Sequence, residues 1–210
     1  MKKNSINVFD EYAAEYDSWF DNNLFTYRAE LAAVKSAIPS AGAGLEVGAG
    51  TGRFTTMMNI YFGIEPAAAM ARIAQKNGLH VIRGYAEALP IPSGLFDFIL
   101  FVTTICFLEK PLIALQEAHR VLKENGRIII GFIDKNSEIG MRYQRKRDSN
   151  KFYKNAHFFS IDEMTDLLQN AGFADFKFYQ TLIHLQKTTI EIPQIGCGKG
   201  SFVVVHGVKK

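Results

Sequence analysis

The stretch GLEVGAGTGRF, residues 44–54, concentrates glycine at one point of a 210-residue chain. Glycine loses more conformational entropy on folding than any other residue, so such a cluster indicates a tight turn, positive φ angles or a ligand against bare backbone. The residues before it, Leu45–Gly48, predict a strand, and a short helix is expected from about Thr51. A glycine-rich turn between a strand and a helix is typical of the first βα unit of nucleotide-binding folds.

Strands and helices alternate on both sides of this turn. Two helices are predicted first, at 8–20 and 27–37; further strands follow at 59–65, 80–84, 96–103 and 127–133, and helices begin at Pro66, Pro111 and Ser160. The last two strands, 173–185 and 201–208, have no helix between them and should pair antiparallel. The pattern predicts one doubly wound α/β domain. The segment 135–156, with its basic run RKRD, is interpreted as a solvated insertion.

Composition limits the function classes. Hydrophobic residues make up 48% and charged residues 21% of the chain, which is typical of a globular protein. The net charge of +3 gives no indication of a nucleic-acid partner. No apolar run approaches the ~18 residues of a membrane span. Cys106 and Cys197 lack zinc-site spacing and are interpreted as reduced thiols, so no metal is expected and a cytoplasmic location is inferred.

Two acidic residues accompany the glycine turn. Glu65 ends the strand after the turn, where a carboxylate can accept hydrogen bonds from both ribose hydroxyls of a nucleotide. Glu46 precedes Gly48-Ala49-Gly50-Thr51-Gly52, a spacing that differs from the G-x-G-x-x-G of dinucleotide sites. A carboxylate beside the turn repels a pyrophosphate but suits a ligand with an ammonium and a sulfonium group. The combination indicates S-adenosylmethionine.

The sequence resembles the class I S-adenosylmethionine-dependent methyltransferases, of the small-molecule type similar to the methyltransferases of ubiquinone and menaquinone biosynthesis. The resemblance covers most of the chain and depends on four segments: LEVGAGTGRF, GIEPAAAM, AEALPIPSGLFDFILFVTTICFLEKP and EAHRVLKENGRIIIGF. It implies a seven-stranded, mostly parallel sheet of order 3-2-1-4-5-7-6 with strand 7 antiparallel. It also implies N-terminal lid helices in residues 1–40 and a cofactor-binding domain in residues 41–210.

The resemblance assigns cofactor-binding roles residue by residue. The methionine portion is expected at Glu46, Gly48, Ala49, Gly50 and Gly52, the ribose at Glu65, the adenine beside Pro66, Met70, Ala86 and Glu87, and the methyl group near Thr103, Thr104 and Ile105. Many relatives carry Asp where this chain has Tyr85. Adenine recognition through Tyr85 stacking, through Glu87 or through backbone alone therefore stays open.

The acceptor and the catalytic groups are less defined by the sequence. No [D/N]-P-P-[Y/F] motif of nucleic-acid amino-methyltransferases follows residue 102; TTIC there is small and apolar with hydroxyls, which favours a neutral or small organic acceptor over a base amine. The stripe containing Tyr12 and Tyr16 resembles a lid helix, so these hydroxyls are candidates to reach the cofactor or the acceptor, with core packing as the alternative. His157 is a candidate base, with a structural role as the alternative. Cys106 and His119 are interpreted as packing residues.

Two other functions stay open at this point. A nicotinamide-dependent oxidoreductase shares the first βαβ unit, although the glycine spacing, Glu46 and the lack of a Tyr-x-x-x-Lys pair after residue 133 argue against it. A non-catalytic S-adenosylmethionine-binding protein with the same fold is the other alternative, because methyl transfer need not leave a catalytic signature. The chain is expected to be a monomer or a homodimer.

Overall fold

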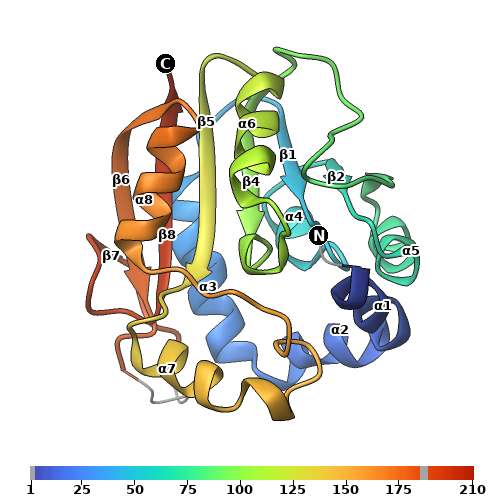
Figure 1. Cartoon of the computed structure of the whole chain (residues 1–210), viewed down its shortest axis with the longest axis vertical. Helices are drawn as coiled ribbons and strands as arrows, with labels where there is room; N and C mark the ends of the chain where they lie inside the picture. The colour runs from blue at the N-terminus through green and yellow to red at the C-terminus, as the bar shows by residue number, and fades with distance from the viewer. Residues whose placement is uncertain (1–2, 185–188) are drawn as a thin grey trace.

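A computed structural model describes residues 3–184 and 189–210 and shows one central sheet with helices on both faces (Figure 1). The strands are β1 Gly44–Val47, β2 Phe62–Ile64, β3 His80–Ile82, β4 Phe96–Val102, β5 Leu122–Ile133, β6 Phe173–Thr181, β7 Gln194–Ile195 and β8 Phe202–Lys209. Their order is β3-β2-β1-β4-β5-β8-β6-β7. β1 to β5 pair in parallel, whereas β8 is antiparallel to both β5 and β6. The predicted doubly wound α/β fold is confirmed.

The strand count differs from the expectation by one. The sheet has eight strands because Gln194 and Ile195 pair with the outer edge of β6. Without this two-residue strand the order is the expected one, and β8 is the antiparallel strand 7. Two residues are too few to show an alternating pattern, so the sequence did not reveal β7. Leu185, the end of the predicted strand 173–185, lies outside the described residues.

Eight α-helices and two 3-10 turns connect these strands in the described part of the chain. They are α1 Lys3–Glu11, α2 Ala13–Asn22, α3 Leu24–Ala37, α4 Arg53–Met57, α5 Ala68–Lys76, η1 Ile105–Phe107, α6 Pro111–Val121, α7 Glu138–Arg145, η2 Arg147–Ser149 and α8 Ile161–Asn170. The helix predicted at 8–20 is two helices, because the backbone leaves helical geometry at Tyr12, with φ −113° and ψ 28°. This break lets α1 pack on α5 while α2 packs against α3.

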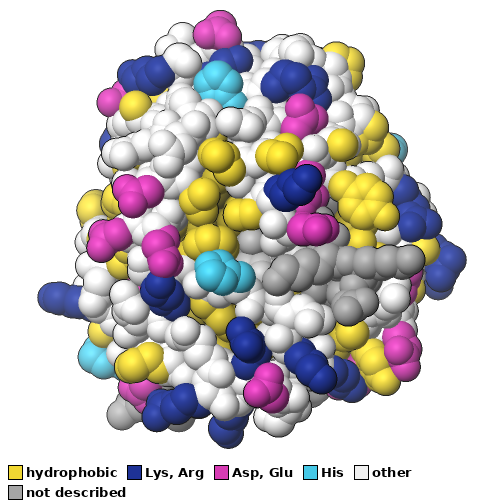
Figure 2. Space-filling model, in the orientation of Figure 1, with side chains coloured by type: hydrophobic (Ala, Val, Ile, Leu, Met, Phe, Trp, Pro, Cys, Tyr) yellow, Lys and Arg dark blue, Asp and Glu magenta, His cyan; other side chains and the backbone are white. Residues whose placement is uncertain are grey.

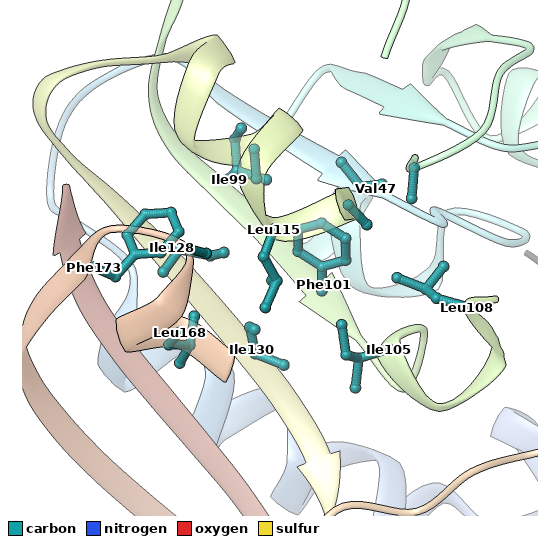
Figure 3. Close-up of a cluster of buried hydrophobic side chains, with 14 of the residues drawn as sticks. Val47, Ile99, Phe101, Ile105, Leu108, Leu115, Ile128, Ile130, Leu168 and Phe173 are labelled. Atoms are coloured by element: carbon teal, nitrogen blue, oxygen red, sulfur yellow. The ribbon is translucent and has the colours of Figure 1, made fainter. Parts of the chain in front are cut away.

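The core lies on both faces of the central strands. Along β4, Ile99 and Phe101 belong to the cluster that contains residues of α6 and α8, whereas Phe98 and Leu100 belong to the cluster that contains residues of α3. This alternation follows from the two-residue period of a strand. Figure 3 shows the first of these faces, where Leu115 of α6 lies between Phe101 and the strand β5.

The segment 135–156 is not simply a solvated insertion. Its basic run is exposed, as predicted, but Ile139 of α7 is buried and Tyr143, Phe152 and Tyr153 pack against the N-terminal helices and η1. Burial of its aromatic residues therefore stabilises the segment, which the charge pattern alone did not reveal. On the face in Figure 2, basic side chains lie among acidic and apolar ones. No helix formed by residues 3–184 or 189–210 has the length and hydropathy to cross a bilayer.

Leu115 tests the layered core. Its side chain is fully buried, so Leu115→Ala should lower the free energy of unfolding by about 2–5 kcal/mol through lost apolar contact and a residual cavity. Urea denaturation measures this change. The matched control is Ile113→Ala on the same helix, whose side chain is 40% exposed and should cost much less. Equal losses for the two variants would contradict the described packing of α6.

Candidate functional site

The glycine turn lies at the carboxyl end of β1, next to the end of β4. Gly48, Gly50 and Gly52 all have positive φ, at 73°, 55° and 83°. A Cβ on Gly48 would lie 2.3 Å from Cγ2 of Thr104, so this position needs glycine for packing. A Cβ on Gly50 would meet only Tyr16, at 4.0 Å. The space beside Gly50 is therefore open to a ligand, as predicted for a glycine-rich turn that binds one.

Glu65 holds the turn from the neighbouring strand. The Gly50 N–H donates to Glu65 Oε2 at 2.9 Å, and the Ala67 N–H donates to Oε1 at 2.8 Å. Burial raises the pKa of Glu65 to about 7, although the two N–H groups favour the charged form. A carboxylate has about four lone-pair positions, so each oxygen can still accept a bond from a ligand hydroxyl.

Glu46 lies behind the turn. Its side chain is buried and accepts a hydrogen bond from the Thr55 hydroxyl of α4. Burial raises its pKa to about 8 against the effect of that bond, and nearby Glu65 raises it further. Glu46 lines a small cavity of about 20 Å³ together with the backbone of the turn, Ala49 included. Its carboxyl group thus borders the space beside Gly50.

Several predicted cofactor residues surround one cavity of about 40 Å³. The residues are Phe9, Tyr16, Gly48, Gly50, Glu65, Met70, Val102, Thr103, Thr104 and Phe107. Thr103 has φ 51°, a left-handed conformation that costs energy in a residue with a Cβ. It turns the chain at the end of β4, and its side chain interacts with the Tyr16 hydroxyl. Burial raises the pKa of Tyr16, which keeps this hydroxyl protonated.

The N-terminal helices cover this cavity. Arg53 of α4 pairs with Asp17 at 2.6 Å and with Asp21 at 2.8 Å, and so holds α2 over the glycine turn. Asp10 of α1 accepts a hydrogen bond of 2.7 Å from the Ala69 N–H at the start of α5. Phe9 is buried against residues of α5 and η1. The aromatic residues predicted for a lid helix therefore pack in the core and also cover the site.

Other predicted site residues lie elsewhere. His157 is exposed, its ring contacts Phe159 at a centroid distance of 4.7 Å, and it lines none of the described cavities. Glu87 accepts a hydrogen bond of 3.0 Å from the Glu109 N–H. Tyr85 is exposed.

Tyr12, Pro66, Ala86 and Gly52 are also absent from the lining of these cavities. The Tyr12 ring lies under Lys151 Nζ at 3.9 Å. The Pro66 carbonyl accepts a bond of 2.7 Å from Arg83. Ala86 is buried in the main core, and Gly52 forms the N-cap of α4. The glycine turn, Glu65, Met70, Thr103 and Tyr16 therefore surround one space, and the binding roles predicted for Tyr12, Pro66, Ala86 and Gly52 stay predictions.

A second cavity of about 430 Å³ lies beyond Tyr16 and Thr103, which line both spaces. Its lining comes from α2, α3, α4, the end of β5 and the segment 135–156. Seven of its fifteen lining residues are aromatic, and Tyr143 and Tyr153 stack with ring centroids 4.8 Å apart. In Figure 1, α2, α3 and α7 enclose this lower end of the sheet.

Glu30 of α3 is the lining residue that sequence reasoning missed. It is only 6% exposed, on the helix face that buries Tyr27, Val34 and Ala37. Burial raises its pKa to about 8. The signal was present, because a carboxylate stands among the apolar positions of the predicted helix 27–37. No group of three or more His, Cys, Asp or Glu suited to a metal occurs within residues 3–184 and 189–210.

Glu30 should make stability depend on pH. Its pKa is raised from 4.5 to about 8, so the folded chain retains this proton while the unfolded chain has lost it. Stability falls as pH rises through that interval. Between about pH 4.5 and 8, wild type should therefore lose more than ~1 kcal/mol relative to Glu30→Gln, measured by urea denaturation. The control is Glu117→Gln: Arg120 lowers the pKa of Glu117 from its ordinary value of 4.5, so the contribution of Glu117 is lost only below that pH and its difference from wild type should be nearly constant across this interval. If the difference in the free energy of unfolding between wild type and Glu30→Gln did not change with pH, the burial of Glu30 would be contradicted.

The comparisons with known proteins agree with this geometry. Residues 45–130 match the model of a methyltransferase domain family. An uncharacterized protein of Methanocaldococcus jannaschii is 44% identical over 206 residues, which cover 97% of this chain and 100% of that protein. A Thermotoga maritima crystal structure described as "SAM-dependent methyltransferase, possible histamine N-methyltransferase" is 45% identical, with a TM-score of 0.94 over 97% of this chain and 99% of the other.

A more distant structure shares the fold alone. A Haloferax volcanii methyltransferase, solved in complex with the Trm112 methyltransferase activator, has a TM-score of 0.70 at 17% identity and covers 96% of each chain. The family assignment follows from the Thermotoga relative and the domain match, together with the glycine turn and Glu65. The chain belongs to the S-adenosylmethionine-dependent methyltransferases of class I.

Proposed function

We propose that the chain transfers a methyl group from S-adenosylmethionine to a small organic acceptor. The observation that carries this proposal is the arrangement of two cavities that share Tyr16 and Thr103. One contains the glycine turn and Glu65, the expected cofactor residues. The other is larger, and its lining includes seven aromatic residues from the N-terminal helices, α4 and the segment 135–156. Its volume of about 430 Å³ lies in the range of small-molecule sites.

The residues around the smaller cavity fit the chemistry of the cofactor. Glu65 has lone pairs left for the two ribose hydroxyls, and Gly50 leaves its backbone accessible. Glu46 lies near the place expected for the methionine portion; burial raises its pKa, and a cationic ligand beside it would favour its charged form. The space of about 40 Å³ is well below the ~300 Å³ of a typical ligand pocket. Side chains of α1 and α2, Phe9 among them, must therefore move to admit the cofactor.

The bound cofactor supplies an activated methyl group on a sulfonium. The chain aligns the acceptor with this group and excludes water, which can contribute ~7–11 kcal/mol in favourable cases. Tyr16 and Thr103 are proposed to position the reacting groups, because they form the boundary between the cavities. The Tyr16 hydroxyl stays protonated at neutral pH, so it acts as a hydrogen-bonding group and not as a base. His157 has no proposed role in the transfer.

Direct binding and transfer measurements test this function. We expect S-adenosylmethionine, and not NAD, to bind in calorimetric titrations and to raise the melting temperature. Radiolabelled methyl groups should pass to components of a metabolite extract, and histamine deserves a separate assay because of the description of the Thermotoga relative. Cofactor binding without any transfer would favour the non-catalytic alternative, and binding of NAD alone would favour the oxidoreductase.

Glu65→Ala should weaken S-adenosylmethionine binding about ten- to a hundred-fold. The variant loses charge-assisted bonds to the ribose, worth about 1.5–3 kcal/mol, and also the acceptor that orients the Gly50 N–H. Calorimetry measures the affinity, and circular dichroism checks the fold. Asp97→Ala, which changes a carboxylate at the opposite end of β4, is the control. Unchanged affinity in Glu65→Ala would refute the ribose assignment.

We further propose that α1 and α2 act as a lid over the cofactor. Hydrogen exchange across residues 9–20 should slow when S-adenosylhomocysteine is added, because the ligand bridges the helices and the glycine turn. Exchange in the core strand β4 should change little, which provides an internal control. Ligand binding without any change at residues 9–20 would show that these helices are a fixed part of the fold.

A further inference from the structure

The larger cavity contains a buried carboxylate that no described residue neutralises. Glu30 is 6% exposed, and it has no hydrogen-bond or ion-pair partner among residues 3–184 and 189–210. Burying an acidic side chain without a partner costs several kcal/mol, and buried polar groups are normally satisfied. Glu46 and Glu65 are satisfied in this way, because each accepts a hydrogen bond from the chain. Glu30 has no such bond within the described part of the chain, and it lines the cavity, where a ligand can supply the partner.

The walls of the cavity suit a cation. Tyr16, Tyr143 and Tyr153 all lie within electrostatic range of Glu30 and line the same space. Phe152 contacts Tyr16 edge-on, at a centroid distance of 5.6 Å. The faces of aromatic rings carry negative potential and attract ammonium groups. Aromatic walls around a carboxylate therefore favour an organic cation over an anion.

The other charged residues near the cavity do not supply that cation. No Lys, Arg or His is among the described residues that line it. Arg53 is close, but Asp17 and Asp21 already bind its guanidinium. Lys151 pairs with Glu15 at the exposed rim, at 2.6 Å. Glu30 is thus left to pair with a ligand, and a bound cation would favour its charged form.

We propose that this cavity binds a small organic ammonium compound with an apolar body, and that Glu30 is its counter-ion. The compound is the methyl acceptor, so this assignment rests on the proposed methyltransferase function. Glu30 recognises the cationic group, and the aromatic walls bind the apolar part. The acceptor class is then an amine, not an acid or a neutral alcohol. For transfer, the bound ammonium gives one proton to the Glu30 carboxylate; the freed nitrogen lone pair then forms the new C–N bond as the bond between the methyl carbon and the sulfonium sulfur breaks, and S-adenosylhomocysteine leaves.

A charge-matched ligand series tests the proposal. Small primary, tertiary and quaternary ammonium compounds are titrated against the protein in saturating S-adenosylhomocysteine, each beside the alcohol and the carboxylate of the same skeleton. One such set is 2-phenylethylamine, 2-phenylethanol and phenylacetate. The ammonium members should bind at least ten-fold more tightly than their counterparts. Glu30→Gln should remove at least ten-fold of that affinity. Asp134→Asn, which changes an equally buried carboxyl outside this cavity, should leave it unchanged.

Three results would overturn the proposal: no member of the series binds, the alcohols or carboxylates bind as well as the amines, or Glu30→Gln keeps the preference. Cofactor affinity is measured separately and should be the same in wild type and Glu30→Gln. Failure of wild type to bind S-adenosylmethionine would refute the methyltransferase proposal instead. The two failures are therefore distinguishable.

Discussion

The bidentate contact of Glu65 connects the parts of the site. One carboxylate oxygen holds the Gly50 N–H of the turn after β1, and the other holds the Ala67 N–H at the start of α5. The strand carrying Glu65 thereby fixes a glycine turn that has little conformational preference of its own. Everything proposed for the cofactor depends on this contact, because it sets the distance between the turn and the expected ribose position. It also brings Glu65 close enough to raise the pKa of Glu46.

Three buried glutamates, Glu30, Glu46 and Glu65, have different roles in this structure. Glu46 and Glu65 are desolvated but bonded, and they shape the glycine turn. Glu30 is desolvated and faces a cavity among aromatic side chains. All three have a raised pKa caused mainly by burial. The first two are explained by the chain itself, whereas the third is explained only by a ligand. The aromatic residues of α1 and α2 connect the two spaces, since Phe9 and Tyr16 pack together at a centroid distance of 5.4 Å.

Local patterns predicted the fold and the glycine turn, because a strand, a turn and a helix N-terminus are encoded within ten residues. The same local logic could have identified Glu30, an acid in an apolar helix face. It could not predict that Tyr16 meets Thr103, since that contact joins segments far apart in the chain and depends on the break at Tyr12. It also could not show that His157 faces solvent. In a segment without regular secondary structure, the neighbouring residues do not indicate in which direction a side chain points.

Calorimetric titration of Gly50→Val with S-adenosylmethionine tests the central claim most directly. The added side chain meets little of the protein, with the nearest contact of its Cβ at 4.0 Å, but it fills the space assigned to the cofactor. It also forces a β-branched residue into a positive φ of 55°. Gly50→Ala shares the backbone strain with less bulk and serves as the control, and circular dichroism verifies that both variants fold. The account predicts that Gly50→Val is folded and does not bind the cofactor, while Gly50→Ala retains part of the affinity. A folded Gly50→Val that binds like wild type would show that the turn is only a structural connection.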